Sequence, residues 1–385
     1  MMNKLVAYDL TEVRKKRIVA TAKDWYKSGV LTQPQWEEIK NEYISTLYSP
    51  SPIIRILLFL AAQFGLSTLI GIIVLMFSDM DMIGIQVASF IVGGLIVFFT
   101  EKGFIQDQKH YKSGVTSAGV YVGYSFIYFS VLGESVYSEF VYISWAFVLL
   151  SWATIRYLDI LTIIPAIGCF VALLFLGFEP YIAVLPFIIM FGFTGLFLLS
   201  QFIQKRADVI IWEDHFIIFD TVALLLVYVG GNYFVVRELS LEMMGLELAN
   251  GEDIPFAFLF YGFTVLIPIF YLYWGIIKKS VLFIRVSLLT LALAAFTLKY
   301  YFSLGHPEIS ITISGAILIV IAIALMKHLK IIRNGFTRNP LLTNKWDNQN
   351  MTAFIASQTL GGHSIKDKFS GKGGEFGGGG ASGDF

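Results

Sequence analysis

Long apolar stretches alternate with short polar gaps along the chain from residue 53 to residue 326. Each stretch has roughly 17 to 25 residues, enough for a helix to cross a hydrocarbon core of about 30 Å. Since backbone groups in lipid need internal hydrogen-bond partners, helices are favoured for runs of this length. The pattern predicts an all-α, polytopic membrane bundle of about ten transmembrane helices, at residues 53–77, 82–100, 113–132, 139–155, 160–178, 181–200, 215–236, 255–277, 280–298 and 309–326.

Positive charges between the spans are concentrated in alternate gaps of this pattern. These gaps and the two flanking segments hold nearly all of the lysines and arginines, whereas the intervening gaps hold only Arg237 and Lys299. Short loops rich in Lys and Arg stay in the cytoplasm, so both termini are predicted to be cytoplasmic. Merging or dropping any span would invert the later loops and remove this bias, which favours ten spans.

In the gaps predicted to face outward, acidic side chains such as Glu238, Glu242 and Asp253 outnumber the basic ones. Two interpretations remain open. The outer loops simply avoid positive charge and are solvated, or they form an acidic vestibule that concentrates cations by electrostatic focusing.

Polar segments flank the membrane unit. Residues 1–50 are predicted to form a cytoplasmic helical hairpin, with helices over 8–28 and 34–47. Thr11 is a candidate cap for the first helix and Gly29 its end, while Thr32 caps the second with Pro34 in its first turn. So small a core is marginal alone, and the hairpin is expected to pack on the transmembrane domain, residues 51–330, or on a partner.

The C-terminal residues divide into two predicted segments. Residues 331–370 are expected to be a cytoplasmic, irregular segment with a short amphipathic pattern at 351–360. Residues 371–385 are glycine-rich and are predicted to be disordered. The tail is either a plain flexible extension or a handle for a protein partner, since C-terminal carboxylates such as that of Phe385 can be captured in backbone nests.

A motif in the first segment resembles a known family. The sequence KDWYKSGVLTQPQWEEI (residues 23–39), followed by a multi-span region, is similar to bacterial membrane proteins that carry the domain of unknown function 2157. Trp25, Gly29, Val30, Leu31 and Thr32 match the motif. The resemblance implies a multi-pass protein of the bacterial inner membrane. The family has no established activity, so no residue inherits a role from it.

Composition narrows the function classes. The mean hydropathy of +0.70 and the 56% content of hydrophobic residues exclude an ordinary soluble protein, and the formal net charge is zero. The lipid bilayer is the expected partner, and no nucleic acid is expected. No HExxH, CxxC, P-loop or GxSxG motif occurs, a GxGxxG spacing is found at 378–383 within the low-complexity glycine-rich tail, and the five histidines are scattered. We therefore expect no enzyme, metal or cofactor, and the single cysteine, Cys169, excludes an intramolecular disulfide.

The best candidate site is Asp220, about five residues inside the seventh predicted span. An ionisable group in a span is a functional hypothesis by default, and the alternative is a structural Asp bonded to a neighbouring helix. Glu213, Asp214 and His215 form a polar entrance before it, although the helical period turns His215 away, so no metal site is predicted. Arg285 lies at a similar depth in the ninth span and either pairs with Asp220 or snorkels to the headgroups.

Other span residues are interpreted as packing or bending features. Gly119 and Gly123 form a small-xxx-small step, and Pro165, Pro186 and Pro268 are predicted mid-span kinks or breaks.

Two classes of function remain compatible with the sequence. The first is a permease or transporter of a small molecule or cation, and the alternative is a membrane scaffold or sensor that recruits partners through its cytoplasmic termini.

Overall fold

The computed structural model describes residues 5–76, 80–132, 138–205, 211–242 and 252–301, with the isolated positions 320, 323 and 327. Within these ranges the chain is helical, and the β-type pairing described is an isolated bridge between Tyr48 and His110. Nearly all of the predicted tenth span, 309–326, lies outside the described residues, as do the segments 331–370 and 371–385.

Seven of the described helices are long and apolar enough to cross a membrane. They are α3 (Pro52–Met76), α4 (Met82–Phe99) with its continuation η2 (Thr100–Asp107), α6 (Glu139–Tyr157), α8 (Leu185–Gln204), α9 (Glu213–Gly231), α11 (Ala257–Lys278) and α12 (Val281–Tyr301). The prediction of an all-helical chain with membrane-spanning segments is confirmed to this extent.

The helices at the third and fifth predicted spans are shorter than expected. Helices α5 (Val115–Phe129) and α7 (Ile163–Gly177) have 15 residues each. At 1.5 Å per residue that is about 22 Å, less than a hydrocarbon core of about 30 Å. The count of ten spans and the side of the membrane on which the termini lie therefore stay predictions.

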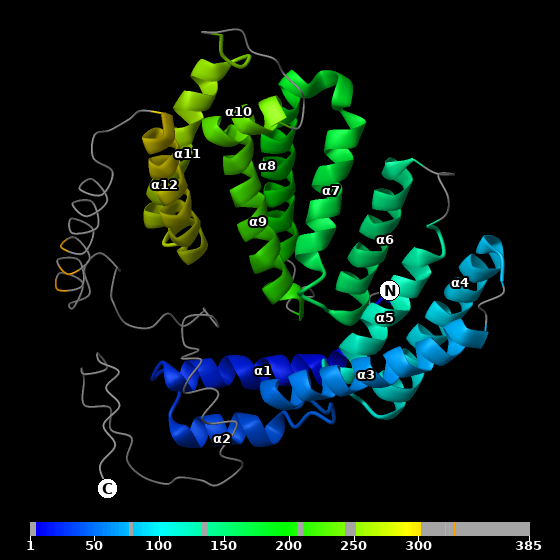
Figure 1. Cartoon of the computed structure of the whole chain (residues 1–385). Coiled ribbons are helices and arrows are strands. Elements are labelled where there is room, and N and C mark those ends of the chain that lie inside the picture. The colour runs from blue at the N-terminus through cyan, green and yellow to red at the C-terminus, as the bar shows by residue number, and fades with distance from the viewer. Residues whose placement is uncertain are drawn as a thin grey trace, which may run out of the picture.

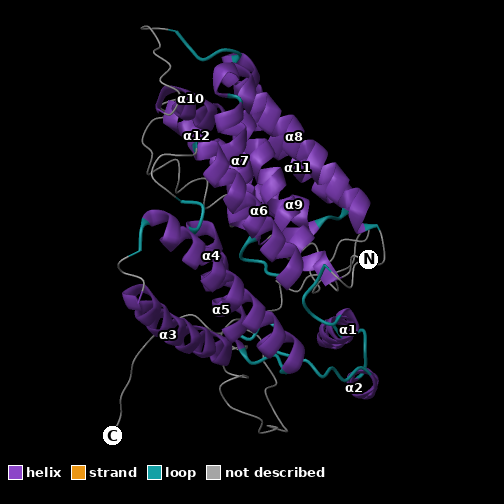
Figure 2. Cartoon of the chain, turned by 90° about the vertical axis from the view of Figure 1, so that its right-hand side faces the viewer, coloured by secondary structure: helices purple, strands orange, loops and turns teal. Residues whose placement is uncertain are grey.

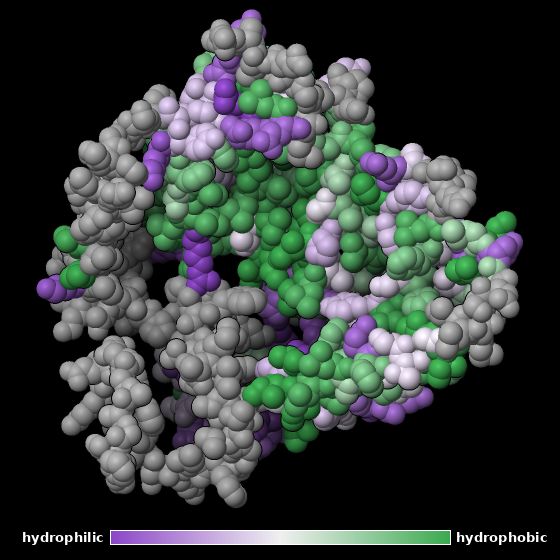
Figure 3. All heavy atoms as spheres, viewed as in Figure 1, coloured by the Kyte–Doolittle hydropathy of each residue, from purple (hydrophilic) through white to green (hydrophobic). Residues whose placement is uncertain are grey.

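The long helices form two groups that α6 and α7 connect (Figures 1 and 2). In the first group, α4 and α3 both pack against α5. In the second, α8 packs along α9, and the α11–α12 pair packs on α9 as well. Helix α6 contacts α5 and pairs with α7, which contacts α8 and α9. The middle of the bundle face seen in Figure 3 is mostly hydrophobic, and hydrophilic residues lie mainly toward its upper and lower ends, as expected for helices that face lipid.

Glycines bring α4 and α5 into backbone contact. A Cβ atom placed on Gly93 would lie 2.6 Å from the carbonyl oxygen of Gly123, and one on Gly119 would lie 2.2 Å from Thr100 Oγ1. Both distances are far below van der Waals contact, so only glycine fits at these positions. The small-xxx-small step at Gly119 and Gly123 is therefore the seam between these two helices.

The N-terminal hairpin consists of α1 (Leu10–Lys27) and α2 (Gln33–Glu42). Asp9, rather than the predicted Thr11, caps α1, because its carboxylate accepts a hydrogen bond of 2.8 Å from the Thr11 backbone N–H. Gly29 follows α1 with a φ of +76°, as a helix-ending glycine does. Thr32 forms a capping box at α2, which ends at Glu42 rather than at the predicted residue 47.

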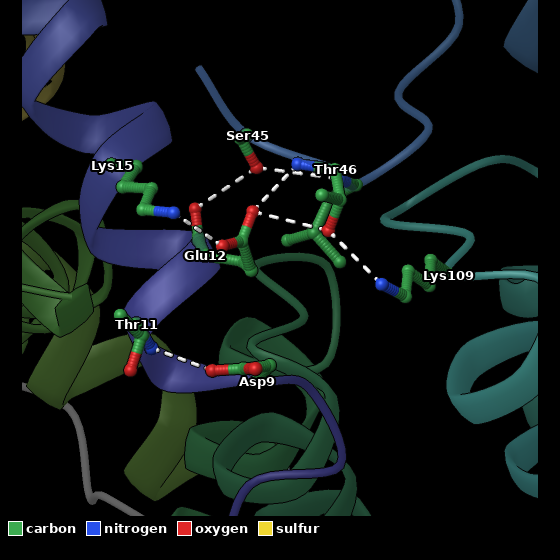
Figure 4. Close-up of polar contacts among 8 residues, drawn as sticks. Asp9, Thr11, Glu12, Lys15, Ser45, Thr46 and Lys109 are labelled. Atoms are coloured by element: carbon green, nitrogen blue, oxygen red, sulfur yellow. Dashed lines mark hydrogen bonds and ion pairs between the residues drawn. The ribbon is translucent and has the colours of Figure 1, made fainter. Parts of the chain in front are cut away.

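A cluster around Glu12 ties α1 to the extended linker that leads into the first membrane helix (Figure 4). The Glu12 carboxylate accepts hydrogen bonds from Lys15 Nζ at 2.7 Å and from the Thr46 backbone N–H at 2.6 Å. Lys109 Nζ, from the segment before α5, reaches Thr46 Oγ1 at 3.4 Å. The hydrogen bonds from Lys15 and Thr46 lower the pKa of Glu12 from 4.5 to about 2.

An apolar core lies between the hairpin segment and one end of the helical bundle. Val6, Tyr8 and Val13 are buried there against Leu158 and Ile211, which lie in two different gaps of the hydrophobic pattern. The Ala7 backbone N–H also donates to the carbonyl oxygen of Arg156 at 2.8 Å. The gaps after α4, α6 and α8 thus meet the hairpin on one side of the bundle, called here the hairpin side.

The helix breaks differ from those predicted. Helix α9 stops at Asn232, where the pattern predicted helix to residue 236, and α10 (Tyr233–Glu242) follows. Asn232 Nδ2 donates to Tyr228 Oη at 2.7 Å and to Thr297 Oγ1 at 3.0 Å, which fixes this break. Pro165 and Pro186 are in the first turns of α7 and α8, so their predicted mid-span position was wrong, although the helix predicted from residue 181 is broken before Pro186. Pro268 does lie inside α11.

Candidate functional site

Asp220, the predicted site residue, is held by neighbours on a single helix. It lies on α9, its residue is only 2% exposed, and its Oδ1 atom accepts a hydrogen bond of 2.6 Å from Ser200 Oγ. Its Oδ2 atom accepts from Gln201 Nε2 at 2.7 Å and from Gln204 Nε2 at 2.8 Å. All three donors belong to α8, so this cluster fastens α8 to α9.

Arg285, the predicted alternative partner of Asp220, lies on α12, which also packs against α9. Its side chain is exposed, whereas Asp220 is buried and takes its hydrogen bonds from α8. Exposure is what the snorkelling interpretation expects of Arg285.

Glu213 and Asp214 bind the N-terminal hairpin. Arg17 of α1 contacts Glu213 Oε2 through Nη2 at 2.5 Å and Asp214 Oδ2 through Nη1 at 2.6 Å. Burial lowers the pKa of the Arg17 guanidinium, but the hydrogen bonds and charges of Asp214 and Glu213 outweigh burial and raise it. The acidic entrance predicted before Asp220 is therefore an ion-pair contact between α1 and α9.

His215 is buried, with 6% exposure, and neither ring nitrogen has a hydrogen-bond partner among the described residues. Within the part of the chain that the structure describes, no three His, Cys, Asp or Glu side chains lie close enough together to hold a metal ion.

Two adjoining cavities run along α5 and are together called the α5 cleft. The first has a volume of about 400 Å³ and lies between the start of α3, the first half of α5 and the segment linking α6 to α7. The second has a volume of about 480 Å³ and lies between α5, α6 and the start of α7. Both are lined by Val120, Tyr121 and Leu161, so the cavities adjoin at these residues. Asp220 lines neither cavity.

Tyrosines form one wall of the α5 cleft. Tyr121, Tyr124 and Tyr128 are spaced three and four residues apart, which places them on one face of α5. All three line the second cavity together with Ser125. The face gives the cleft a row of aromatic rings whose hydroxyl groups can both donate and accept hydrogen bonds.

Charged side chains line the end of the cleft on the hairpin side, called here the mouth. Arg55, near the start of α3, and Lys112, just before α5, line it together with Asp159 from the segment after α6. Asp159 Oδ2 accepts a hydrogen bond of 2.5 Å from Tyr121 Oη, and its Oδ1 accepts one of 3.0 Å from the Leu161 N–H. Arg55 Nε is buried and has no hydrogen-bond partner among the described residues.

A second ion-pair cluster fixes the two walls of the cleft relative to each other. Arg156, at the end of α6, donates to both carboxylate oxygens of Glu101, through Nε and Nη2, at 2.6 Å each. Tyr157 Oη donates to the same carboxylate at 2.7 Å. Glu101 lies in η2, a π-helical turn that continues α4, and α4 is locked to α5 by the glycine seam. The pair thus joins the α5 wall to the α6 wall.

Sequence reasoning missed the residues of the cleft. Arg55, Lys112, Tyr121 and Asp159 come from segments that only the fold brings together. One signal was readable in advance, namely the spacing of the tyrosines in the third predicted span.

No family model matches this chain, and no curated protein and no solved structure matches it either. The resemblance to proteins with the domain of unknown function 2157 therefore stays a prediction.

Proposed function

We propose that the chain is a bacterial inner-membrane permease for a small molecule, with cytoplasmic termini and the α5 cleft as its binding site. The observation that carries the proposal is the pair of adjoining cavities, which lead from a charged mouth past a row of tyrosines into the bundle. Asp220 supports this assignment less well, because three side chains of α8 already occupy its carboxylate.

The chemistry of the walls indicates the kind of molecule. Ligand sites are typically cavities of about 300 to 1,000 Å³ with mostly apolar walls and a few placed polar groups. The α5 cleft fits that description, since tyrosine, leucine and alanine line its depth and charges line its mouth. Such walls suit a molecule with an apolar part and one polar or charged end.

A plug in the second cavity tests the proposal. Ala146 of α6 lines this cavity, so Ala146→Trp should fill it. Val148 lies two residues along the same helix and is 52% exposed, so Val148→Trp is the matched control on the lipid-facing side. Purified variants in proteoliposomes would be screened for the movement of cations, zwitterions and small amphiphiles.

We expect at least one solute to cross faster than in protein-free vesicles, with the flux lost in Ala146→Trp and kept in Val148→Trp. Flux that both variants retain equally would place the pathway elsewhere. An absence of flux for every solute would contradict the permease proposal.

The alternative, a scaffold or sensor, is supported by the hairpin. Helix α2 buries none of its residues and Ile44 just beyond it is exposed, whereas α1 is anchored through Arg17. A photocrosslinking residue at position 44 that captures one defined cytoplasmic protein in cells, in a chain without flux, would favour the scaffold.

A further inference from the structure

We infer that the mouth of the α5 cleft binds the headgroup of a membrane phospholipid, with its phosphate on Arg55 and Lys112 and a headgroup N–H or O–H donor on Asp159. The inference rests on the proposed function, because it names the ligand class of the same cleft.

The two basic residues provide the phosphate site. Arg55 and Lys112 line one cavity, and the buried Nε of Arg55 has no hydrogen-bond partner among the described residues. A buried N–H of a guanidinium costs free energy unless an acceptor meets it. The guanidinium fork matches the oxygens of a phosphate group, and a lysine adds a point charge.

Positive charge is concentrated around this mouth. Lys16 of α1 lies near Arg55. Burial lowers the pKa of the Lys16 ammonium, and the positive charge of Arg55 lowers it further. Lys16 and Lys112 also both contact the ring of Tyr111, at 5.4 and 5.5 Å from its centroid. An anion bound at Arg55 would relieve this repulsion. Tyr111 itself does not supply the anion, since burial raises the pKa of its hydroxyl to about 12.

Asp159 is the one carboxylate among the described residues that line the mouth, and it selects the remainder of the headgroup. Tyr121 and the Leu161 N–H each donate to one of its oxygens and hold the carboxylate in place. An ionised carboxylate has about four acceptor positions, so two donors leave room for another. An ammonium or hydroxyl group a few bonds from the phosphate would meet that need, and a quaternary ammonium, which carries no N–H, would not.

The walls favour a lipid over a soluble phosphate ester. Ile56 and Leu161 line the mouth and are 61% and 71% exposed, and Phe59 adjoins them. Arg55 lies in the first turn of α3, a helix long and apolar enough to cross a membrane, and lipid headgroups are expected beside the first turn of such a helix. Basic pockets between membrane helices are known lipid headgroup sites. The acyl chains would lie on the exposed apolar side chains, which offer nothing to a soluble ester.

Equilibrium binding tests the inference without any transport assay. Purified full-length protein in neutral detergent would be titrated with short-chain phosphatidylethanolamine and followed by native mass spectrometry. Parallel titrations would use phosphatidylcholine, diacylglycerol and soluble glycerophosphoethanolamine. We expect phosphatidylethanolamine to bind more tightly than phosphatidylcholine, and diacylglycerol and the soluble ester to bind weakly or not at all.

Substitutions locate the site. Arg55→Gln and Lys112→Gln should each weaken phosphatidylethanolamine binding about ten- to a hundredfold, as expected for a charge-assisted hydrogen bond. Asp159→Asn should remove the preference over phosphatidylcholine. Lys102→Gln, at an exposed basic residue of η2 on the same side of the bundle, is the matched control and should bind as the wild type does. The thermal unfolding midpoint of each variant reports whether it is folded.

The outcomes separate this inference from the proposed function. Equal binding of diacylglycerol and phosphatidylethanolamine, or undiminished binding by folded Arg55→Gln and Lys112→Gln, would overturn the headgroup site. Tighter binding of the soluble ester would assign the same chemistry to a cytoplasmic ligand. Flux that Ala146→Trp abolishes, in a protein that binds no phospholipid, would sustain the permease and refute the lipid. If Arg55→Gln fails to fold, Lys112→Gln and the headgroup series on the wild type still decide.

Discussion

Replacing Asp220 by leucine and by asparagine separates a structural role from a charge-dependent one. Leucine has the same number of side-chain heavy atoms and the same branching as aspartate but accepts no hydrogen bond, so Asp220→Leu leaves the donors of Ser200, Gln201 and Gln204 unmet. Asparagine can keep all three contacts. Its oxygen can replace Oδ2 and accept from both glutamines, while its NH₂ group donates to the Ser200 hydroxyl, which can act as acceptor.

The expected magnitudes follow from these contacts. Hydrogen bonds between membrane helices contribute about 0.6 kcal/mol each on average and at most about 1.7. Losing three of them should therefore lower the free energy of unfolding of Asp220→Leu by about 2 kcal/mol. Asp220→Asn should lose less than about 1 kcal/mol, because its pairing survives.

The measurement is the free energy of unfolding in mixed micelles titrated with a denaturing detergent. Thr221→Val is the matched control, because Thr221 is the next residue of α9 and its hydroxyl donates to the Ile217 carbonyl oxygen of the same helix. It should unfold nearly as the wild type does. Flux through the α5 cleft should be unchanged in folded Asp220→Asn, since Asp220 does not line the cleft.

Two results would refute this reasoning. If Asp220→Asn destabilises as much as Asp220→Leu, and Arg285→Gln restores the loss, a charge pair rather than the α8 donors holds Asp220. If Asp220→Asn has wild-type stability but loses flux, the pathway runs past Asp220 and not along α5.

Three further predictions concern the hairpin and the topology. Arg17→Gln should weaken the contact of α1 with α9 and speed proteolysis of the linker at residues 43–51. Lys23→Gln, at an exposed basic residue of the same helix, should not. Equal cleavage of both variants would show that the Arg17 ion pairs do not hold the hairpin against α9. The pKa of Glu12 is lowered from 4.5 to about 2, so its contribution to stability is complete above pH 4.5 and is lost as the pH falls toward 2. Hydrogen exchange of the linker should rise over that range, and a Glu12→Gln variant with the same rise would exclude this carboxylate. In a cysteine-free background, Met80→Cys should react with an impermeant thiol reagent added outside cells and Gln204→Cys should not, and the reverse would invert the proposed orientation.

The sequence predicted the parts of the fold that depend on hydrophobic periodicity and on local capping. The long apolar runs give seven span-length helices, and Gly29 and Thr32 bound the hairpin helices as expected. The break at Asn232 could not be foreseen, since it depends on a hydrogen bond to Thr297, which is distant in the sequence. Pro165 and Pro186 were misplaced because span boundaries from hydropathy are uncertain by a few residues, enough to move a proline from mid-span to the first turn.

The site was less accessible to sequence reasoning for a physical reason. Asp220 stands out in the sequence because burying a carboxylate in an apolar run costs free energy. Hydrogen bonds from Ser200, Gln201 and Gln204 offset that cost, and nothing in the sequence marks these three residues as its partners. Arg55 stood at a span boundary, where a basic residue needs no explanation. Only the fold brings it into one cavity with Asp159.

The glycine seam between α4 and α5 also constrains which sequences can share this fold. A single methyl group at Gly93 would meet the backbone of α5, one at Gly123 would meet the Val97 side chain, and one at Gly119 would meet Thr100. Replacing any of these glycines even by alanine would push the two helices apart. Distant relatives whose overall similarity has faded should still carry glycines at these three places, 26 and 4 residues apart. The spacing offers a means of recognising them that does not depend on aligning the apolar runs, which any membrane protein resembles.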